Sequence, residues 1–309
     1  MRVEALAGTT VAVLFLVFLT AAQASAPAFQ YIHSFGAGNG RQSGPGQLAT
    51  PEGVAVQRAT GDVLVADNMN DRIQEFAPTG KFIRAFGTQG SKTGQFNSPI
   101  GLGVNHAGDI YVADNVNARV QEFSSTFKFI RRFGTFSTGP GDLAVAPNGD
   151  VYVVDGATIR HYQGNGKYVG SFGGTGGGKG QFHSTIDGLA VGPKGQVWAG
   201  DYSGGRVEDF SPTGTYIRSV AYKGNTAVLG PLGVGVTSSA IFVSDNGNGR
   251  VIELYLNGTL ERTFGVSGKG RLDSTASLAL DCRGNVYVSD LDVGRVREYG
   301  NPATSKGMC

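Results

Sequence analysis

The sequence predicts an all-β fold, a six-bladed β-propeller built from four-stranded antiparallel blades. Three observations carry this prediction: a composition suited to short strands, a six-fold internal repeat, and a fourth strand that is missing at the end of the chain but present at its start. The chain has 309 residues, of which 50 are glycine and 16% are charged. This composition favours many short strands joined by tight turns over a helical or disordered chain.

The first residues predict export. An apolar run over residues 11–19 and small residues over 21–26 form the pattern of a cleavable secretory signal. We expect cleavage after Ala24 or after Ala26, and a signal peptide over residues 1–24 is preferred. An uncleaved anchor is the alternative. No later stretch approaches the roughly 18 consecutive apolar residues of a membrane span, so we expect a mature protein that is secreted, periplasmic or at the cell surface.

The charge and the cysteine content limit the possible binding partners and cross-links. The formal net charge of +2 is too small to predict a nucleic-acid partner. Cys282 and Cys309 are the only cysteines, and in an exported protein such a pair can form a disulfide, here one that ties the tail at 301–309 to the last repeat. Asn257 begins the single glycosylation sequon, although a turn role for its Asn-Gly pair explains it equally well.

A strand that ends in aspartate recurs six times. The Asp-to-Asp steps are 47, 41, 46, 44 and 45 residues, a period typical of propellers and repeat arrays. Each copy is a short β-branched and aromatic run that ends in a turn former, which is the signature of a strand. The six copies lie at Val63–Asp67, Ile110–Asp114, Val151–Asp155, Val197–Asp201, Ile241–Asp245 and Val286–Asp290.

Three further strands surround each copy, giving strands a to d in every blade. A small-residue strand such as Gly53–Val56 precedes the copy, and strands such as Arg72–Phe76 and Lys81–Gly87 follow it. Glycine and alanine in strand a suit a position near the central axis, where neighbouring blades crowd together. Larger aromatic residues in the later strands are expected to fill the widening space between blades.

The two ends of the chain predict how the ring closes. The last repeat stops after Tyr299 without a fourth strand, whereas residues 29–36 form an unassigned strand ahead of the first repeat. We expect this N-terminal strand to complete blade six, since pairing the two ends removes open sheet edges. A single propeller domain is therefore predicted over residues 28–300.

The repeat unit resembles the NHL repeat. Residues 65–87, with the run Val-Ala-Asp-Asn-Met-Asn-Asp-Arg-Ile-Gln-Glu-Phe, and residues 94–102 carry the resemblance, which extends over about residues 28–300. It implies a six-bladed propeller. The family includes protein-binding propellers, extracellular sensor domains, RNA-binding propellers and a zinc-dependent amidating lyase, so the resemblance predicts fold more sharply than activity. Export and weak basicity disfavour the RNA-binding function.

A zinc-dependent lyase is the best-defined enzymatic alternative to a binding function. The resemblance implies zinc-binding histidines directly after the proline that begins strand a, and the matching positions here are Glu52, Ile100, Asp187 and Leu232. None is histidine, and the four histidines of the chain lie in different parts of the fold. We therefore predict no catalytic residue and no cofactor. A metal-dependent propeller lyase or hydrolase, with Glu52 and Asp187 holding zinc or calcium, remains the alternative.

Two repeated patterns of charge have structural explanations. Runs such as Asp67-Asn-Met-Asn-Asp71 lack the distal acidic residue of a calcium loop, so we interpret them as turns. A catalytic constellation breaks symmetry, whereas a scaffold contact keeps it, so the repeated Asp–Arg pairs are interpreted as turn-locking contacts. These pairs are Asp67 with Arg72, Asp114 with Arg119, Asp201 with Arg206, Asp245 with Arg250 and Asp290 with Arg295. Blade three is expected to lack one.

The predicted binding surface is the face that carries both the linkers from strand d to the next strand a and the turns from b to c. We call it the linker face; antiparallel pairing puts these two kinds of connection on the same side. Exposed apolar and aromatic residues among mixed charges are typical of a protein contact surface. The candidate binding residues are Arg41, Met69, Lys92, Phe136, His183, Tyr202, Lys223 and Leu291. The sequence thus predicts a monomeric exported propeller that binds a protein, a peptide or a glycan.

Overall fold

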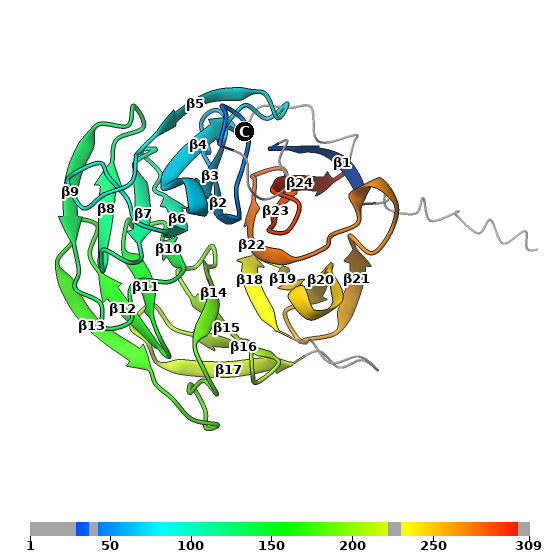
Figure 1. Ribbon diagram of the computed structural model, residues 1–309. Helices are drawn as coiled ribbons and strands as arrows, with labels where there is room; N and C mark the ends of the chain where they lie inside the picture. Colours follow the sequence, from blue (N-terminus) through cyan, green and yellow to red (C-terminus); the bar gives the residue numbers. More distant parts are fainter. Residues whose placement is uncertain (1–28, 37–42, 222–229, 302–309) are drawn as a thin grey trace, which may run out of the picture.

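The computed structural model describes residues 29–36, 43–221 and 230–301. Six four-stranded antiparallel sheets form a ring, and the first strand of each blade lies nearest the centre (Figure 1). The predicted signal peptide lies outside the described residues. Within them, no helix is long and apolar enough to cross a membrane.

Each blade follows the chain from the centre of the ring outwards, in the order a, b, c, d. Blade one comprises β2 (Pro51–Val56), β3 (Val63–Asp67), β4 (Arg72–Phe76) and β5 (Phe82–Phe86). Blades two and three comprise β6 (Pro99–Val104), β7 (Ile110–Asp114), β8 (Arg119–Phe123), β9 (Phe129–Phe133), and β10 (Leu143–Val145), β11 (Val151–Asp155), β12 (Thr158–Tyr162), β13 (Tyr168–Gly173). Blades four and five comprise β14 (Ile186–Val191), β15 (Val197–Asp201), β16 (Arg206–Phe210), β17 (Tyr216–Ala221), and β18 (Pro231–Val236), β19 (Ala240–Asp245), β20 (Arg250–Tyr255), β21 (Leu260–Phe264).

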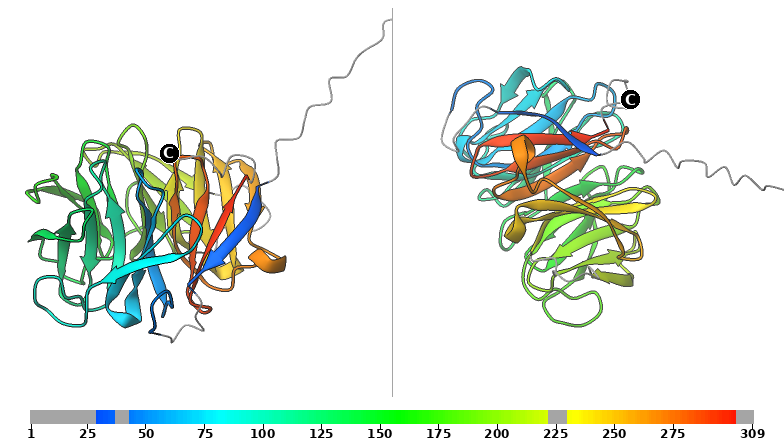
Figure 2. Two further views of the ribbon diagram at one scale, coloured as in Figure 1. Left: turned by 90° about the horizontal axis from the view of Figure 1, so that it is seen from above. Right: turned by 90° about the vertical axis from the view of Figure 1, so that its right-hand side faces the viewer.

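Blade six is assembled from both ends of the chain. Its strands are β22 (Thr275–Leu280), β23 (Val286–Asp290), β24 (Arg295–Gly300) and β1 (Gln30–Phe35). β1 pairs antiparallel with β24, with Phe35 opposite Val296, and the two strands lie side by side in both views of Figure 2. The predicted closure by the N-terminal strand is confirmed.

Glycine lets neighbouring inner strands approach one another backbone to backbone. A Cβ atom placed on Gly101 of β6 would lie 2.7 Å from both the carbonyl oxygen of Gly141 and the backbone nitrogen of Leu143, in the next blade. Real Cβ atoms do not pack that closely, so only glycine is accommodated there. The expectation that strand a carries small residues because blades crowd at the axis is confirmed.

The hydrophobic core is divided among the interfaces between blades. Six buried clusters are present in the described residues, one at each junction of neighbouring blades, including the junction of blades six and one. Trp198 is fully buried in the cluster between blades four and five, so its predicted role as repeat core is confirmed. Aromatic rings of strands b, c and d fill most of these junctions, where they bury large apolar areas.

Each described linker is anchored by one apolar side chain beneath it. These anchors cover the glycine that ends strand d and are Leu48, Phe96, Phe136, Phe182 and Leu272. Phe136 is only 5% exposed and belongs to the core cluster of blades two and three. Its predicted place on the exposed surface is therefore wrong. The linker before blade three is short, which hid the equivalence of Phe136 with Phe96.

Candidate functional site

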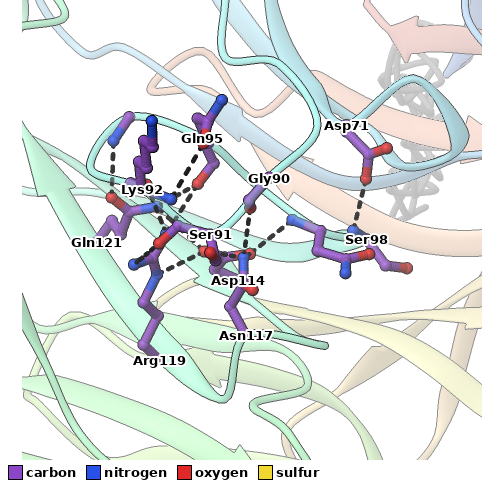
Figure 3. Close-up of polar contacts among 12 residues, drawn as sticks. Asp71, Gly90, Ser91, Lys92, Gln95, Ser98, Asp114, Asn117, Arg119 and Gln121 are labelled. Atoms are coloured by element: carbon purple, nitrogen blue, oxygen red, sulfur yellow. Dashed lines mark hydrogen bonds and ion pairs between the residues drawn. The ribbon is translucent and has the colours of Figure 1, made fainter.

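The Asp–Arg pairs fasten the linkers to the b–c turns. In blade two, buried Asp114 accepts hydrogen bonds from Arg119 Nε at 2.7 Å, from Asn117 Nδ2 at 2.9 Å and from the backbone N–H of Asn97 at 2.8 Å (Figure 3). Arg119 then donates to three linker carbonyls, those of Ser91, Lys92 and Gln95. A carboxylate whose lone pairs are used in this way holds the scaffold together, and the interpretation as turn-locking contacts is confirmed for this pair.

In two blades, the arginine that pairs with the aspartate of strand b comes from a different position of strand c. In blade three, Arg160 Nε lies 2.7 Å from Asp155 Oδ2, so the predicted absence of a pair there is wrong. In blade six, Asp290 pairs with Arg297 at 2.7 Å and not with Arg295, which is exposed. Both arginines lie two residues further along strand c than expected. Residues i and i+2 share one face of a strand, so a long arginine side chain reaches the same aspartate from either position.

The aspartate-rich turns are held by their own hydrogen bonds. Asp67 accepts bonds from the N–H of Ala49 and from the side chains of Asn70, Arg72 and Gln74. Asp71, at a φ of 51°, accepts the N–H of Ser98 in the following linker. These contacts use the carboxylate oxygens that a calcium ion would require, and the interpretation of the run as a turn is confirmed.

The predicted binding residues occupy several environments. Met69 is 64% exposed, Tyr202 is 39% exposed, and Lys92 also lies in solvent on the linker face. Leu291 lines the mouth of the central channel. Arg41 and Lys223 lie outside the described residues.

His183 is tied to the scaffold of blade four. Its Nδ1 lies 2.9 Å from Oδ2 of fully buried Asp201, and its ring occupies the space that a turn asparagine fills in blade two. The corresponding turn residue here is Gly204, whose added Cβ would meet the imidazole. The other described histidines are dispersed, and no group of three or more His, Cys, Asp or Glu side chains among the described residues is placed to hold a metal ion.

A cavity of about 260 Å³ opens at the channel mouth on the linker face. Three carboxylates line it: Glu52 of blade one, Asp142 of blade three and Asp187 of blade four. Its apolar lining residues are Ile100, Ile186, Leu232, Ala276 and Leu291. The structure thus brings Glu52 and Asp187, the two carboxylates singled out in the sequence, into one cavity and adds a third.

The local backbone explains why these acids are there. Glu52 lies in an irregularity of pairing between Pro51 and Val54, and Asp187 in the matching irregularity between Ile186 and Leu189. A β-bulge bends a strand and redirects a side chain. The two acids can therefore line the channel without disturbing the ladder below.

Asp142 was missed in the sequence. It occupies the position of Gly53, Gly101, Gly188 and Gly233 at the axis, and an alignment of strand a through blade three would have shown an acid among glycines. Its carboxylate accepts the N–H of Leu143 and, across the blade junction, the N–H of Leu189, both at 2.9 Å. Asp142 therefore adds a carboxylate to the channel mouth and joins blade three to blade four.

Burial raises the pKa values of these acids, and for Glu52 and Asp142 the charge of neighbouring acids adds to the rise. Burial raises the pKa of Glu52 to about 7, and the charge of Asp187 adds to the rise. Burial also raises the pKa of Asp142 to about 7, against the opposing effect of its two backbone hydrogen bonds. For Asp187, burial raises the pKa to about 6, opposed by a hydrogen bond from Thr185. The cavity therefore changes charge within the range of physiological pH.

The donor set does not suit a catalytic zinc or a calcium ion. Zinc enzymes use three protein ligands, most often histidine nitrogens, and calcium takes six to eight oxygens. Both oxygens of Asp142 already accept backbone N–H groups, which leaves Glu52 and Asp187, the latter hydrogen-bonded to Thr185, as the remaining carboxylates of the cavity. These two residues are too few for either ion.

Comparison with known proteins places the fold in context. Among curated proteins, no sequence matches the chain. Virginiamycin B lyase from Staphylococcus aureus, in its selenomethionine-substituted form, superposes with a TM-score of 0.59 at 11% identity, covering 80% of this chain and 79% of that one. Its catalytically inactive histidine-to-alanine variant with quinupristin gives 0.60 at 12%, covering 84% and 82%. A streptogramin B lyase structure gives 0.59 at 12%, covering 87% and 98%. At these identities the likeness is one of fold.

The family model for the NHL repeat matches residues 96–123, which run from the linker anchor Phe96 to the end of β8. This segment holds the a, b and c strands of blade two together with the Asp114–Arg119 pair. The same arrangement of strands recurs around the closed ring. The chain is thus an NHL-repeat six-bladed β-propeller.

Proposed function

We propose that this propeller is an exported, monomeric recognition protein that binds a protein or peptide partner on its linker face, with a cationic side chain of the partner entering the channel mouth. The acidic cavity carries this proposal. At about 260 Å³ it is smaller than the roughly 300–1,000 Å³ of ordinary small-molecule pockets, so it suits a single side chain. Exposed Met69 and Tyr202 provide apolar contacts elsewhere on the linker face.

The chemistry of the cavity matches lysine or arginine. Leu232, Ile100 and Ile186 can pack against the aliphatic stem of such a side chain, while the carboxylates of Glu52 and Asp187 meet its charged head. A bound cation would also favour the charged forms of Glu52 and Asp187, against the burial that raises their pKa values. Binding of a cationic peptide is therefore expected to release protons.

A peptide series tests the proposal. Short peptides that differ at one position, Lys or Arg against Gln, would be titrated into the mature protein by calorimetry at pH 6 and pH 8. We expect the Lys and Arg peptides to bind more tightly at pH 8, and E52Q to weaken them about tenfold or more. D292N, which removes an exposed charge from a linker-face turn outside the cavity, is the matched control. Equal binding of Gln and Lys peptides would refute the cationic-ligand proposal.

Export has its own test. Intact mass and N-terminal sequencing of the protein recovered from the extracellular or periplasmic fraction are expected to give a start at Ser25, or at Pro27 for the second cleavage site. Retention of the full-length chain in the membrane fraction would instead support the uncleaved anchor.

An acid–base lyase or hydrolase is the second candidate. It is favoured by Glu52, whose pKa of about 7 leaves both protonation states populated near neutral pH, as general acid–base catalysis requires. No histidine lines the cavity, although a histidine substitution inactivates the structurally similar virginiamycin B lyase. Incubation with quinupristin, followed by mass spectrometry, separates the two. Turnover by wild type but not by E52Q would support the lyase and count against a purely binding function.

A further inference from the structure

Blade six carries one arginine more than its scaffold contact needs. In each of the other five blades, the arginine five residues after the last aspartate of strand b pairs with that aspartate. In blade six, Arg297 takes this place: its Nε lies 2.7 Å from Asp290 Oδ2, and its Nη1 donates to the carbonyl of Lys269 at 2.9 Å. Arg295, which holds the position of the pairing arginine, is therefore released from the scaffold.

The released arginine lines a cavity at the seam where the ring closes. Arg295 is exposed and makes no hydrogen bond or ion pair with any residue that the structure describes. The cavity has a volume of about 380 Å³ and lies between β1 and β24 of blade six and β4 and β5 of blade one. Small-molecule sites have volumes of roughly 300–1,000 Å³, so this cavity is large enough for a small ligand.

Aromatic side chains supply the apolar part of the lining. Phe35, Phe76 and Phe82 all line the cavity. The ring centroids of Phe35 and Phe76 are 4.8 Å apart, and those of Phe76 and Phe82 are 6.0 Å apart, so the three rings form one continuous group. No acidic side chain is among the described lining residues. The cavity therefore combines an apolar surface with one guanidinium that has no compensating negative charge.

We propose that this cavity binds a small organic acid, with its apolar body against half-buried Phe82 and its carboxylate on the guanidinium of Arg295. The planar guanidinium offers paired N–H donors that match the two oxygens of a carboxylate. One arginine balances the single charge of a carboxylate, whereas a phosphate dianion would bring a second charge without a partner. This cavity shares no lining residue with the acidic cavity at the channel mouth. The inference stands whether or not the cationic-ligand proposal is correct.

A carboxylate and its uncharged amide provide the test. Phenylacetate and phenylacetamide share one aromatic body and differ in charge, and each would be titrated into isotope-labelled mature protein at pH 7. Backbone amide signals in NMR spectra report both the affinity and the place of binding. We expect phenylacetate to shift the signals of the cavity glycines Gly36, Gly46 and Gly80. We expect it to bind about fivefold or more tightly than phenylacetamide, because only the acid pairs with the guanidinium.

Two variants complete the experiment. R295Q is expected to lower the affinity for phenylacetate about fivefold or more, to that for phenylacetamide. Arg58 is also exposed, lies outside this cavity and pairs with no described residue, so R58Q is the matched control and is expected to bind both probes as wild type does. Equal affinities for the acid and the amide, unchanged binding in R295Q, or shifts confined to other parts of the ring would each overturn the proposal.

Discussion

Asp142 Oδ2 accepts the backbone N–H of Leu189 at 2.9 Å, so the residue that adds a third charge to the channel also joins blade three to blade four. Its other oxygen accepts the N–H of Leu143. D142A would leave two backbone donors without their carboxylate, and we expect it to lower the free energy of unfolding by about 1–3 kcal/mol at pH 7. Urea unfolding measures the change, with D292N expected within about 0.5 kcal/mol of wild type. A neutral D142A would show that water replaces the carboxylate.

The channel acids make stability depend on pH. Glu52 holds its proton up to about pH 7 in the folded protein but loses it near 4.5 when unfolded. Between these values the folded state binds more protons, so the contribution of Glu52 to stability is present below pH 4.5 and is lost as the pH rises to about 7. E52Q is expected to flatten this dependence and to raise stability at pH 8 by on the order of 1–2 kcal/mol. Unfolding curves of both proteins at pH 5 and pH 8 provide the check, and a parallel pH dependence in the two would contradict it.

Arg295 and Arg297 form a matched pair within β24. Arg297 is buried against Asp290, with Nε and Oδ2 2.7 Å apart, whereas Arg295 is exposed. R297A would leave Asp290 as an uncompensated buried charge and is expected to cost about 3–5 kcal/mol. R295A should cost no more than about 0.5 kcal/mol. Thermal and urea unfolding of the two variants would distinguish them, and equal losses would contradict the assignment of Arg297 as the partner.

Gly101 and Gly170 contrast an axial with a peripheral glycine. A Cβ on Gly101 would lie 2.7 Å from backbone atoms of the next blade, while one on Gly170 of β13 would meet nothing within 4 Å. G101A must therefore separate two inner strands, and we expect a loss of about 3 kcal/mol or more. G170A should be neutral or slightly stabilising. The unfolding midpoints of the two variants test this difference. A G101A variant as stable as wild type would mean that the inner strands can move apart freely.

The fold could be read from the sequence because its determinants repeat. Six aspartates end strand b, and each of them is followed by an arginine five residues later, so each blade confirms the others. The errors fell where a blade departs from this pattern. Arg297 reaches Asp290 from a shifted position, and Phe136 sits in a shortened linker whose alignment is ambiguous. Pairwise spacing alone could not distinguish these cases, because side-chain reach and burial depend on the assembled sheet.

Only part of the candidate site could be predicted from the sequence, for a related reason. Glu52 and Asp187 stand out because they follow the start of strand a. Their proximity, and the participation of Asp142, result from closure of the ring, which brings blades one, three and four around one axis. The raised pKa values arise from this shared burial, and no local segment of sequence encodes it.

The pairing of β1 with β24 sets a condition on how the molecule is made. Ribosomes deliver the N-terminal strand first, yet its partner is the last strand of the final repeat. Until β22 to β24 have been made, β1 has no partner strand and the junction of blades six and one cannot form. Joining segments so distant in sequence is entropically slow. The nascent chain is therefore an open arc with two unfinished edges until its last strand is made.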